Sequence, residues 1–335
     1  MLRYSVRRFG QLLLVVAALS VLLFAWLRSL PGGPVSALLG DRGTAASRAQ
    51  LEAALGLDQP IWVQYLRFLG RASTGDFGVS TGVQPGEPAM SLFLQRLPAT
   101  VELAFLAILL AVAAGIPLGY LAARRRGGWL DNAGVISSLV GVAVPVFFLA
   151  FLLKLVFAVQ LGWLPTSGRQ SAGIDATRVT GFFVLDGLLT REWDAAWDAA
   201  THLVLPALAL SSIPFAVIFR ITRAAVLDVL DEDYVRTAYS KGLTTGVIRR
   251  RHVLRNALLP VVTIIGLQTG ALLSGAVLTE RVFAYQGVGQ ALAIGFERRD
   301  YAVLHLVIIA AAMVYVLVNL IVDLSYALID PRLSR

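Results

Sequence analysis

Long uncharged apolar blocks alternate with shorter polar segments along the chain. A bilayer core about 30 Å thick requires roughly 20 apolar residues in helical form, and six blocks reach or approach that length. Within lipid only helices and closed barrels pair all of their backbone polar groups, and blocks of this length suit helices. We therefore predict an all-α integral membrane protein with six transmembrane helices. The six blocks are 9–27, 103–123, 133–159, 203–219, 257–279 and 301–329.

Composition excludes an ordinary soluble domain. The 335 residues are 57% hydrophobic and 15% charged, whereas soluble domains are about 45–50% apolar and about 25% charged. The chain has no cysteine, so disulfides and thiolate metal sites are excluded. Its three histidines are scattered along the sequence, and we expect no metal site.

The basic residues indicate which side of the membrane each segment faces. If the N-terminus is cytoplasmic, the inner segments are 1–8, 124–131, 220–256 and 330–335, and these hold 16 of the 29 lysines and arginines. An excess of positive charge in short segments marks the cytoplasmic side. Both termini are therefore predicted to be cytoplasmic. The net charge of +8 reflects this topology, and no nucleic-acid partner is expected.

The chain divides into three predicted parts. Residues 1–30 form the N-terminal tail and the first transmembrane helix. Residues 31–97 form an extracytoplasmic segment whose short apolar patches, such as 61–66, indicate a small cap or amphipathic helices. Residues 98–335 form a five-helix core that carries the long cytoplasmic loop 220–256.

That cytoplasmic loop has the signals of two short helices. Three carboxylates (231–233) begin the first, and Lys241 lies near its end, which suits the helix dipole. Gly242 follows where a left-handed residue is favoured, and Thr244 or Thr245 can cap the second helix. We interpret the loop as two helices joined by a glycine turn that dock on a partner. The alternative is a solvated basic loop that only enforces topology.

Two stretches of this loop, 233–243 (Asp-Tyr-Val-Arg-Thr-Ala-Tyr-Ser-Lys-Gly-Leu) and 252–260 (His-Val-Leu-Arg-Asn-Ala-Leu-Leu-Pro), closely resemble the coupling loop of dipeptide and oligopeptide ABC importer permeases. The resemblance extends over essentially the whole chain. Further motifs in the family's order are 30–34 (Leu-Pro-Gly-Gly-Pro), 55–60 (Leu-Gly-Leu-Asp-Gln-Pro), 75–78 (Gly-Asp-Phe-Gly), 96–100 (Arg-Leu-Pro-Ala-Thr), 144–148 (Val-Pro-Val-Phe-Phe), 161–165 (Leu-Gly-Trp-Leu-Pro), 319–323 (Asn-Leu-Ile-Val-Asp) and 330–332 (Asp-Pro-Arg).

The resemblance implies the permease subunit of an ATP-driven di- or oligopeptide importer, with the type I ABC importer fold, in the bacterial cytoplasmic membrane. Its partners would be a homologous second permease, two ATPase subunits or domains, an extracytoplasmic solute-binding protein and membrane lipid. No cofactor is expected on this chain: ATP and Mg²⁺ belong to the ATPases, and neither lysine precedes the Ser or Thr of a P-loop. The implied coupling residues are Tyr234, Arg236, Ala238, Ser240, Lys241, Gly242, Leu243, Arg249 and Arg250.

Three features depart from the family pattern. Arg236 stands where the general coupling motif has a glutamate, a variation associated with the peptide branch. Arg281 and 284–287 (Ala-Tyr-Gln-Gly) replace a small residue and a Trp-Pro-Gly turn, and Gly33 replaces an aspartate. The last two features lie on the outer side, so they bear on the solute and the binding protein more than on coupling.

Polar and kink-forming residues within the spans are candidates for the solute path or its gate. Charged groups inside a span are costly and face the protein interior or water; Glu280 is the foremost candidate for an outer-gate or binding-protein contact. Asp323 is expected to pair with Arg220 or Arg223 or to cap a partner helix. Polar side chains in spans more often form helix–helix hydrogen bonds, so packing is the alternative role. The candidates are Glu102, Ser211, Ser212, Pro214, Gln268, Glu280 and Asn319.

Glycines and prolines predict where the helices approach one another or bend. Gly115 and Gly119, and likewise Gly266 and Gly270, stand four residues apart and predict close packing of helix backbones. Four prolines are expected to kink or break their helices near the middle of the membrane: Pro117, Pro145, Pro206 and Pro214.

Other functions are not excluded by the residues. Nickel complexes, haem or glutathione pass through relatives of the same architecture. A secondary transporter would need a buried carboxylate at a broken helix, and it leaves the docking loop unexplained. An intramembrane serine protease would need a serine facing a histidine inside the membrane. The hydrolase-like pattern 78–82 (Gly-Val-Ser-Thr-Gly) lies in the outer segment, which leaves only His305 within a span.

Overall fold

The computed structural model describes residues 2–29, 35, 39, 44–54, 56–174 and 176–329, with side chains for all of these but 2–9, 11–13, 274, 275 and 322–329. Its regular elements are helices, and the one isolated bridge among the described residues joins Val79 to Pro88. The all-α prediction is confirmed. The predicted motifs at 30–34 and 330–332, and the side chain of Asp323, lie outside this description.

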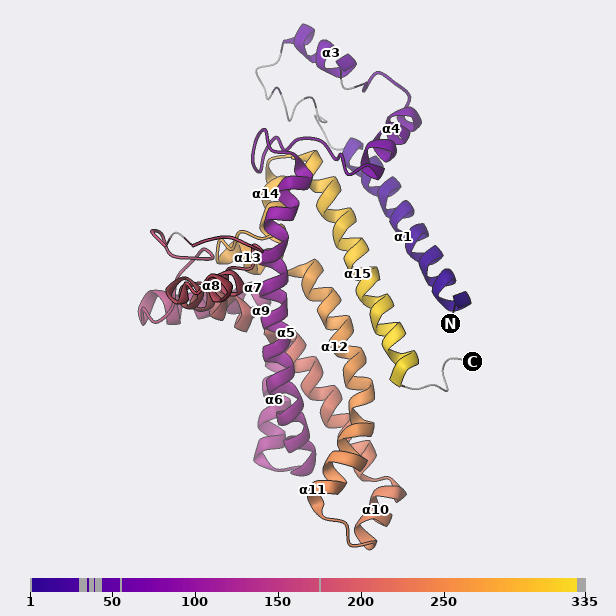
Figure 1. Cartoon of the computed structure of the whole chain (residues 1–335), viewed down its shortest axis with the longest axis vertical. Helices are drawn as coiled ribbons and strands as arrows, with labels where there is room; N and C mark the ends of the chain where they lie inside the picture. The colour runs from indigo at the N-terminus through magenta and orange to yellow at the C-terminus, as the bar shows by residue number, and fades with distance from the viewer. Residues whose placement is uncertain are drawn as a thin grey trace.

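Four described helices are long and apolar enough to cross a membrane. They are α5 (Ala89–Arg124), α9 (Trp193–Leu230), α12 (Arg255–Gly275) with the short helices before it, and α15 (Tyr301–Ile329). A bent pair adds a fifth span if it counts as one, and α1 (Leu2–Ser29) contains the shorter apolar stretch Leu14–Ser29 where the first span was predicted. In Figure 1, α5, α12, α15 and α1 lie in succession across the view. Six spans with both termini cytoplasmic stays a prediction.

The predicted third span, 133–159, is not one continuous helix. α6 (Trp129–Ala143) ends before Pro145, and α7 (Val146–Leu153) with η2 (Lys154–Gln160) then continues in a direction turned by 103°. Proline supplies no N–H to the helix and keeps the preceding residue extended. Val144 accordingly has φ −78° and ψ 122°. The break predicted at Pro145 is therefore present.

The fourth predicted span, 203–219, is only the middle of a much longer helix. α9 begins at Trp193, inside the predicted outer loop, and continues through Pro206 and Pro214 without interruption. Prolines are tolerated inside membrane helices when neighbouring groups satisfy the freed backbone carbonyls. The two prolines therefore do not break α9, and a kink at either of them stays a prediction.

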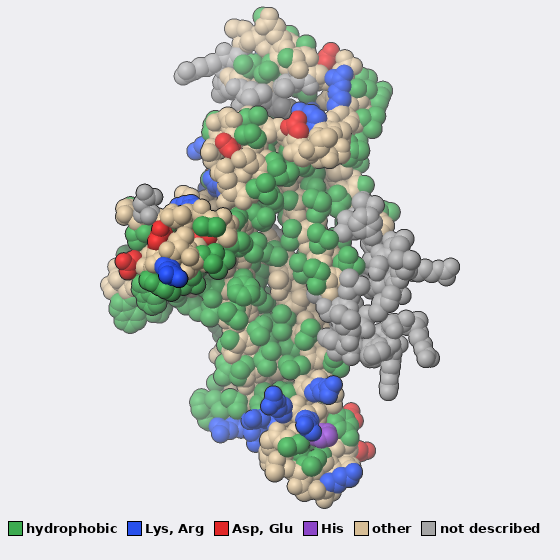
Figure 2. Space-filling model, in the orientation of Figure 1, with side chains coloured by type: hydrophobic (Ala, Val, Ile, Leu, Met, Phe, Trp, Pro, Cys, Tyr) green, Lys and Arg blue, Asp and Glu red, His purple; other side chains and the backbone are tan. Residues whose placement is uncertain are grey.

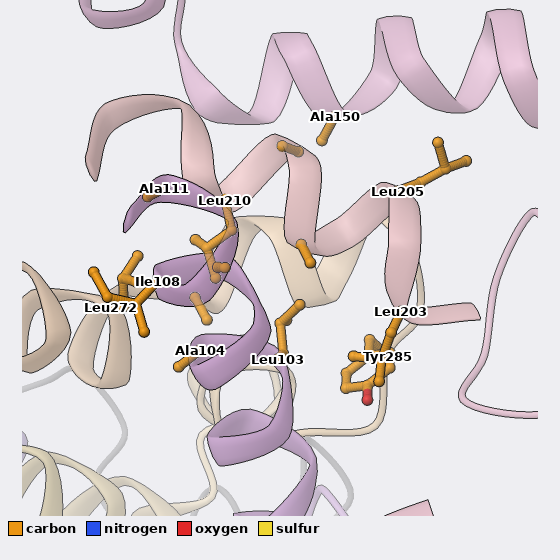
Figure 3. Packing of buried hydrophobic residues seen from close by; sticks show 14 of the residues in the cluster. Leu103, Ala104, Ile108, Ala111, Ala150, Leu203, Leu205, Leu210, Leu272 and Tyr285 are labelled. Atoms are coloured by element: carbon orange, nitrogen blue, oxygen red, sulfur yellow. The ribbon is translucent and has the colours of Figure 1, made fainter. Parts of the chain in front are cut away.

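The core forms where α5 packs along α9. A Cβ atom on Gly115 would lie 2.9 Å from Ile218 Cγ2, and one on Gly119 would lie 2.7 Å from the Phe219 carbonyl oxygen. This close approach confirms the packing face predicted for the two glycines. Small and branched side chains interdigitate around it, including Leu103, Ala104, Ile108 and Ala111 of α5 and Leu203, Leu205 and Leu210 of α9 (Figure 3). Because lipid is as apolar as leucine, such packing holds membrane helices together.

The segment that is predicted to be extracytoplasmic contains α3 (Ala45–Ala54) and α4 (Ile61–Ser73), at the upper end in Figure 1. Trp62, Leu66 and Leu69 of α4 are exposed, whereas Phe68 packs against Phe24 of α1. That this segment forms a small cap or amphipathic helices outside the membrane stays a prediction.

A buried carboxylate ties this segment to α15. Asp300 Oδ2 accepts hydrogen bonds from three successive backbone N–H groups, 81–83, at 2.9–3.1 Å, and from the Ser80 hydroxyl. His305 Nδ1 instead donates to the Tyr301 carbonyl oxygen at 2.8 Å. The Ser80 hydroxyl therefore bonds to Asp300 and not to His305.

Candidate coupling loop and translocation path

The loop that is predicted to be cytoplasmic consists of α10 (Asp233–Ser240), α11 (Thr245–Val247) and η3 (Ile248–Leu254), beyond the ends of α9 and α12 at the lower end in Figure 1. Gly242 has φ +74°, a conformation that side chains disfavour. The Leu243 N–H donates to the Ala238 carbonyl at 3.3 Å and closes the turn. Two short helices joined by a glycine turn are thus confirmed. Thr244 occupies the cap position of α11, but its side chain forms no capping bond.

One face of the loop is fixed to the transmembrane helices. Val235, Ala238, Ile248 and Val253 are buried and pack with Val226 of α9 in one cluster. Ala238, predicted as a coupling residue, therefore lies on the inward face and anchors α10. This buried face gives the loop a defined position on the helices that carry it.

The opposite face is exposed to solvent and carries basic and aromatic side chains. Figure 2 shows basic side chains gathered at this end of the molecule. Tyr239 and Val247 are also exposed, at 51% and 38%. They were not predicted as coupling residues, although their spacing on the two helices could have indicated that they lie on this face. The predicted residues found on this face are Tyr234, Arg236, Ser240, Lys241, Gly242, Leu243, Arg249 and Arg250.

A hydrogen bond links the first helix of the loop to α12. Asn256 Nδ2 donates to the Tyr234 hydroxyl at 2.9 Å and to the His252 carbonyl at 3.0 Å. Arg236 lies 3.6 Å from Asp233, but both side chains are exposed, and such pairs contribute little stability. The arrangement leaves the Arg236 guanidinium available to a partner.

Glu102, a predicted path residue, lies in a buried hydrogen-bond network between α5 and the segment that precedes α9. Arg169 Nη2 donates to Glu102 Oε2 at 3.0 Å and to the Gly181 carbonyl at 2.9 Å. Its guanidinium lies 3.6 Å from the centre of the Phe183 ring, and the Val184 N–H donates to Glu102 Oε1 at 3.0 Å. The sequence contained no signal for Arg169. Glu102 therefore fastens the loop before α9 to α5.

Glu280, the other predicted carboxylate, is fully buried in α13 (Val277–Val282), beyond the end of the α12 span. The Thr100 hydroxyl donates to Glu280 Oε1 at 2.6 Å, and the Gln290 N–H donates to Oε2 at 2.8 Å. Burial raises the pKa of the Glu280 carboxyl to about 7. Gly287 leaves room for this carboxylate, since a Cβ atom there would overlap it. Glu280 therefore presents no atom to a binding protein in this conformation.

A cavity of about 400 Å³ lies among the start of α7, α9, α12 and α13. Pro145, Pro214 and Gln268 line it, together with Thr279, the neighbour of Glu280. The structure thus brings together Pro214 and Gln268 of the predicted path residues. The cavity is bounded mainly by apolar side chains, which suits a solute held without strong polar bonds.

The remaining path candidates lie elsewhere. The hydroxyls of Ser211 and Ser212 donate to the carbonyls of Leu208 and Ala209 in their own helix, at 2.9 Å each. Asn319 Oδ1 is buried in α15 and has no hydrogen-bond partner among the described residues. These three positions stay predictions. Within the described part of the chain, no three His, Asp or Glu side chains are grouped so as to hold a metal ion.

Residues 115–335, which include the whole coupling loop and the cavity, match the family described as "Binding-protein-dependent transport system inner membrane component". The chain belongs to this family. Residues 1–104 match the N-terminal component of the same kind of transport system. The family predicted from the loop motif is thereby confirmed.

Similar proteins match the chain over its whole length. The dipeptide transport system permease protein DppB of Alkalihalophilus pseudofirmus is 39% identical over 100% of both chains. That of Escherichia coli K12 is 42% identical over 100% of this chain and 99% of the relative. The di/tripeptide transport system permease protein DppB of Pseudomonas aeruginosa is also 42% identical, with the same coverage. All three are named as permease proteins of peptide transport systems.

A solved structure has the same fold. A chain of the inward-facing MetNI methionine ABC transporter superposes with a TM-score of 0.53, covering 72% of this chain and 97% of that one, at 16% identity. At this identity the similarity establishes the fold alone. The ABC importer permease fold predicted from the sequence is confirmed.

Proposed function

We propose that this chain forms half of the translocation pathway of an ATP-driven importer for di- and oligopeptides, in the bacterial cytoplasmic membrane. The observation that carries the proposal is the loop 231–256, which is anchored on one face and open on the other. A loop that only enforced topology would need neither the buried anchors Val235 and Ile248 nor the positive-φ glycine turn at Gly242.

The energy source belongs to other chains. Two ATPase subunits or domains bind ATP and Mg²⁺, and each docks on the coupling loop of one permease. A homologous second permease supplies the other half of the path, and an extracytoplasmic solute-binding protein delivers the peptide. This chain binds no cofactor and is not itself an enzyme.

Transport would follow alternating access. Movement of the docked ATPases displaces the loop, and its buried anchors transmit the displacement to α9 and α5. The cavity beside Pro145 lies where α6 ends and α7 turns by 103°, so a change of helix direction there would alter access to it. The buried bonds of Glu102 and Glu280 hold the outer side closed until that movement occurs.

Docking is tested by site-directed cross-linking, which the cysteine-free chain makes straightforward. Leu243→Cys places a thiol on the open face of the loop, and Trp62→Cys places one on the exposed outer face of α4. We expect a bifunctional thiol reagent to join the Leu243→Cys variant, and not the Trp62→Cys variant, to the ATPase that purifies with the chain. Cross-linking of neither variant would contradict the docking role.

The solute class is tested separately in proteoliposomes that contain the complete transporter and its binding protein. The names of the relatives favour peptides. We expect dipeptides to stimulate ATP hydrolysis and to accumulate inside. Stimulation by a nickel complex, haem or glutathione, and not by dipeptides, would reassign the solute while leaving the coupling role intact.

A further inference from the structure

A pocket of about 570 Å³ lies at the outer end of the molecule, where α1, α3, α4 and α15 meet. Three arginines line it: Arg28 at the end of α1, and Arg67 and Arg71 on one face of α4. Tyr301 and His305, from the first turns of α15, line it as well. Its volume is within the range of sites for small molecules or headgroups.

Three arginines concentrate positive charge at this pocket. No carboxylate of the described residues forms an ion pair with Arg28, Arg67 or Arg71. Arg28 is half-buried, with its guanidinium 5.2 Å from the centre of the Phe24 ring. Arg67 and Arg71 are exposed. Like charges gathered at one pocket repel one another, and a bound anion reduces that repulsion. Guanidinium groups match phosphate oxygens in a bidentate geometry.

Two buried polar atoms beside the arginines also lack partners. The Tyr301 hydroxyl and His305 Nε2 have no hydrogen-bond partner among the described residues. Because His305 Nδ1 lies 2.8 Å from the Tyr301 carbonyl, which can only accept, Nδ1 carries the proton and Nε2 of a neutral ring is an acceptor. A ligand that suits the pocket therefore combines an anionic group with a hydrogen-bond donor.

The pocket lies at the level where lipid headgroups are expected. On α1, Leu14, Leu22 and Trp26 are exposed below Arg28, and an exposed apolar run of this kind faces acyl chains. On α4, Trp62 is exposed on the opposite face from the arginines. Tryptophans concentrate at the membrane–water boundary.

We propose that this pocket binds the headgroup of an anionic phospholipid of the outer leaflet. The three guanidinium groups hold the phosphate, and a headgroup hydroxyl, as in phosphatidylglycerol, donates to the acceptor of His305. The bound lipid joins α4 to α1 and α15 and so fixes the extracytoplasmic helices on the membrane-spanning part. This role is independent of the transported solute.

Two variants test the site by different means. Arg67→Gln with Arg71→Gln removes two charges. Gly70→Leu keeps every charge but places a side chain in the pocket, and a Cβ atom there meets nothing within 4 Å. The matched control is Arg125→Gln with Arg126→Gln, which removes two exposed charges at the other end of the molecule. Co-purification of each variant with the other transporter subunits establishes that it has folded.

The measurement is native mass spectrometry of the full chain, purified with its accompanying subunits, delipidated and titrated with dioleoyl phosphatidylglycerol. We expect both pocket variants to bind the first lipid on the order of tenfold more weakly than the wild type and the control do, because charge-assisted bonds or space are lost. Dioleoyl phosphatidylcholine should bind all four proteins alike. Phosphatidylglycerol binding that is unchanged in both pocket variants would overturn the proposal.

Two further arms distinguish other occupants. Displacement of phosphatidylglycerol from the wild type by millimolar inorganic phosphate would assign the pocket to a free anion and overturn the lipid proposal. Loss of solute-binding-protein affinity in the pocket variants, with phosphatidylglycerol binding retained, would assign it to an acidic protein surface and also overturn it.

Discussion

Arg223 of α9 holds Asp131 of α6 through both carboxylate oxygens. Nη2 donates to Oδ2 at 2.8 Å, and Nε donates to Oδ1. The Gly127 N–H adds a third bond to Oδ2 at 2.9 Å, and the Asp131 side chain is only 4% exposed. The pair fixes the start of the bent α6–α7 unit to the helix that carries the coupling loop, and it takes one of the two arginines predicted to pair with Asp323.

Breaking this pair should destabilise the protein. Asp131→Asn leaves the Arg223 charge partly buried without its counter-charge, which typically costs about 3–5 kcal/mol in a buried pair. We expect a lower melting temperature for the purified transporter. In a double-mutant cycle, Asp131→Asn combined with Arg223→Gln should lose less than the sum of the two single changes. Strict additivity would mean that the two residues act separately.

Gly242 should be sensitive to substitution because of its backbone and not because of crowding. Nothing lies within 4 Å of a Cβ atom there, but φ is +74°, and an L-residue pays roughly 1–2 kcal/mol in this region. Proline cannot adopt it at all. We expect Gly242→Pro to leave the chain in the membrane and to uncouple ATP hydrolysis from uptake, with a smaller effect for Gly242→Ala.

Gly246 provides the control for this prediction. It lies in α11, four residues further on, and also has open space around its Cβ position, but its φ is not positive. Gly246→Ala should therefore support normal uptake in the same proteoliposomes. Uptake at the wild-type rate by Gly242→Pro would show that the turn does not transmit coupling.

The α5–α9 contact should not tolerate even one methyl group at Gly119. A Cβ atom would lie 2.7 Å from the Phe219 carbonyl and 2.9 Å from Thr222 Cβ, and overpacking of this kind costs about 1–3 kcal/mol. We expect Gly119→Ala to lower the melting temperature. Gly141→Ala, which meets α9 at ordinary distances of 3.4 Å or more, should not. Equal melting temperatures for the two variants would refute the contact.

Glu280 should make stability depend on pH. Burial raises the pKa of its carboxyl from 4.5 to about 7, so between these values the folded chain holds a proton that the unfolded chain has released. Stability therefore falls as pH rises from about 4.5 to about 7 and stays low above it. Melting temperatures of Glu280→Gln, measured across this range, should fall less steeply than those of the wild type.

A nearby exposed carboxylate serves as the control for the pH series. Glu297, which pairs with Arg281 at the surface, has a side chain that is 54% exposed. Glu297→Gln should keep the wild-type slope. A Glu280→Gln variant with an unchanged slope would mean that another group titrates in this window.

Local features of the fold were predictable because their causes are local. The helical blocks follow from runs of apolar residues, the break at Pro145 from its missing N–H, and the turn at Gly242 from the low cost of positive φ in glycine. The length of α9 was underestimated, since polar residues at both of its ends hid the helix. Its two prolines were expected to kink or break it, but the helix continues through both.

By itself, then, the sequence determined the helical membrane class, the family, and the two-helix form of the coupling loop. Only the tertiary structure decided which charges meet. Arg169 and Glu102 are 67 residues apart, and Arg223 and Asp131 are 92 apart. It also turned Ala238 inward and gathered Arg28, Arg67 and Arg71 around one pocket. Which side chains come into contact depends on how each helix is rotated against its neighbours, and that rotation is set by packing across the whole fold.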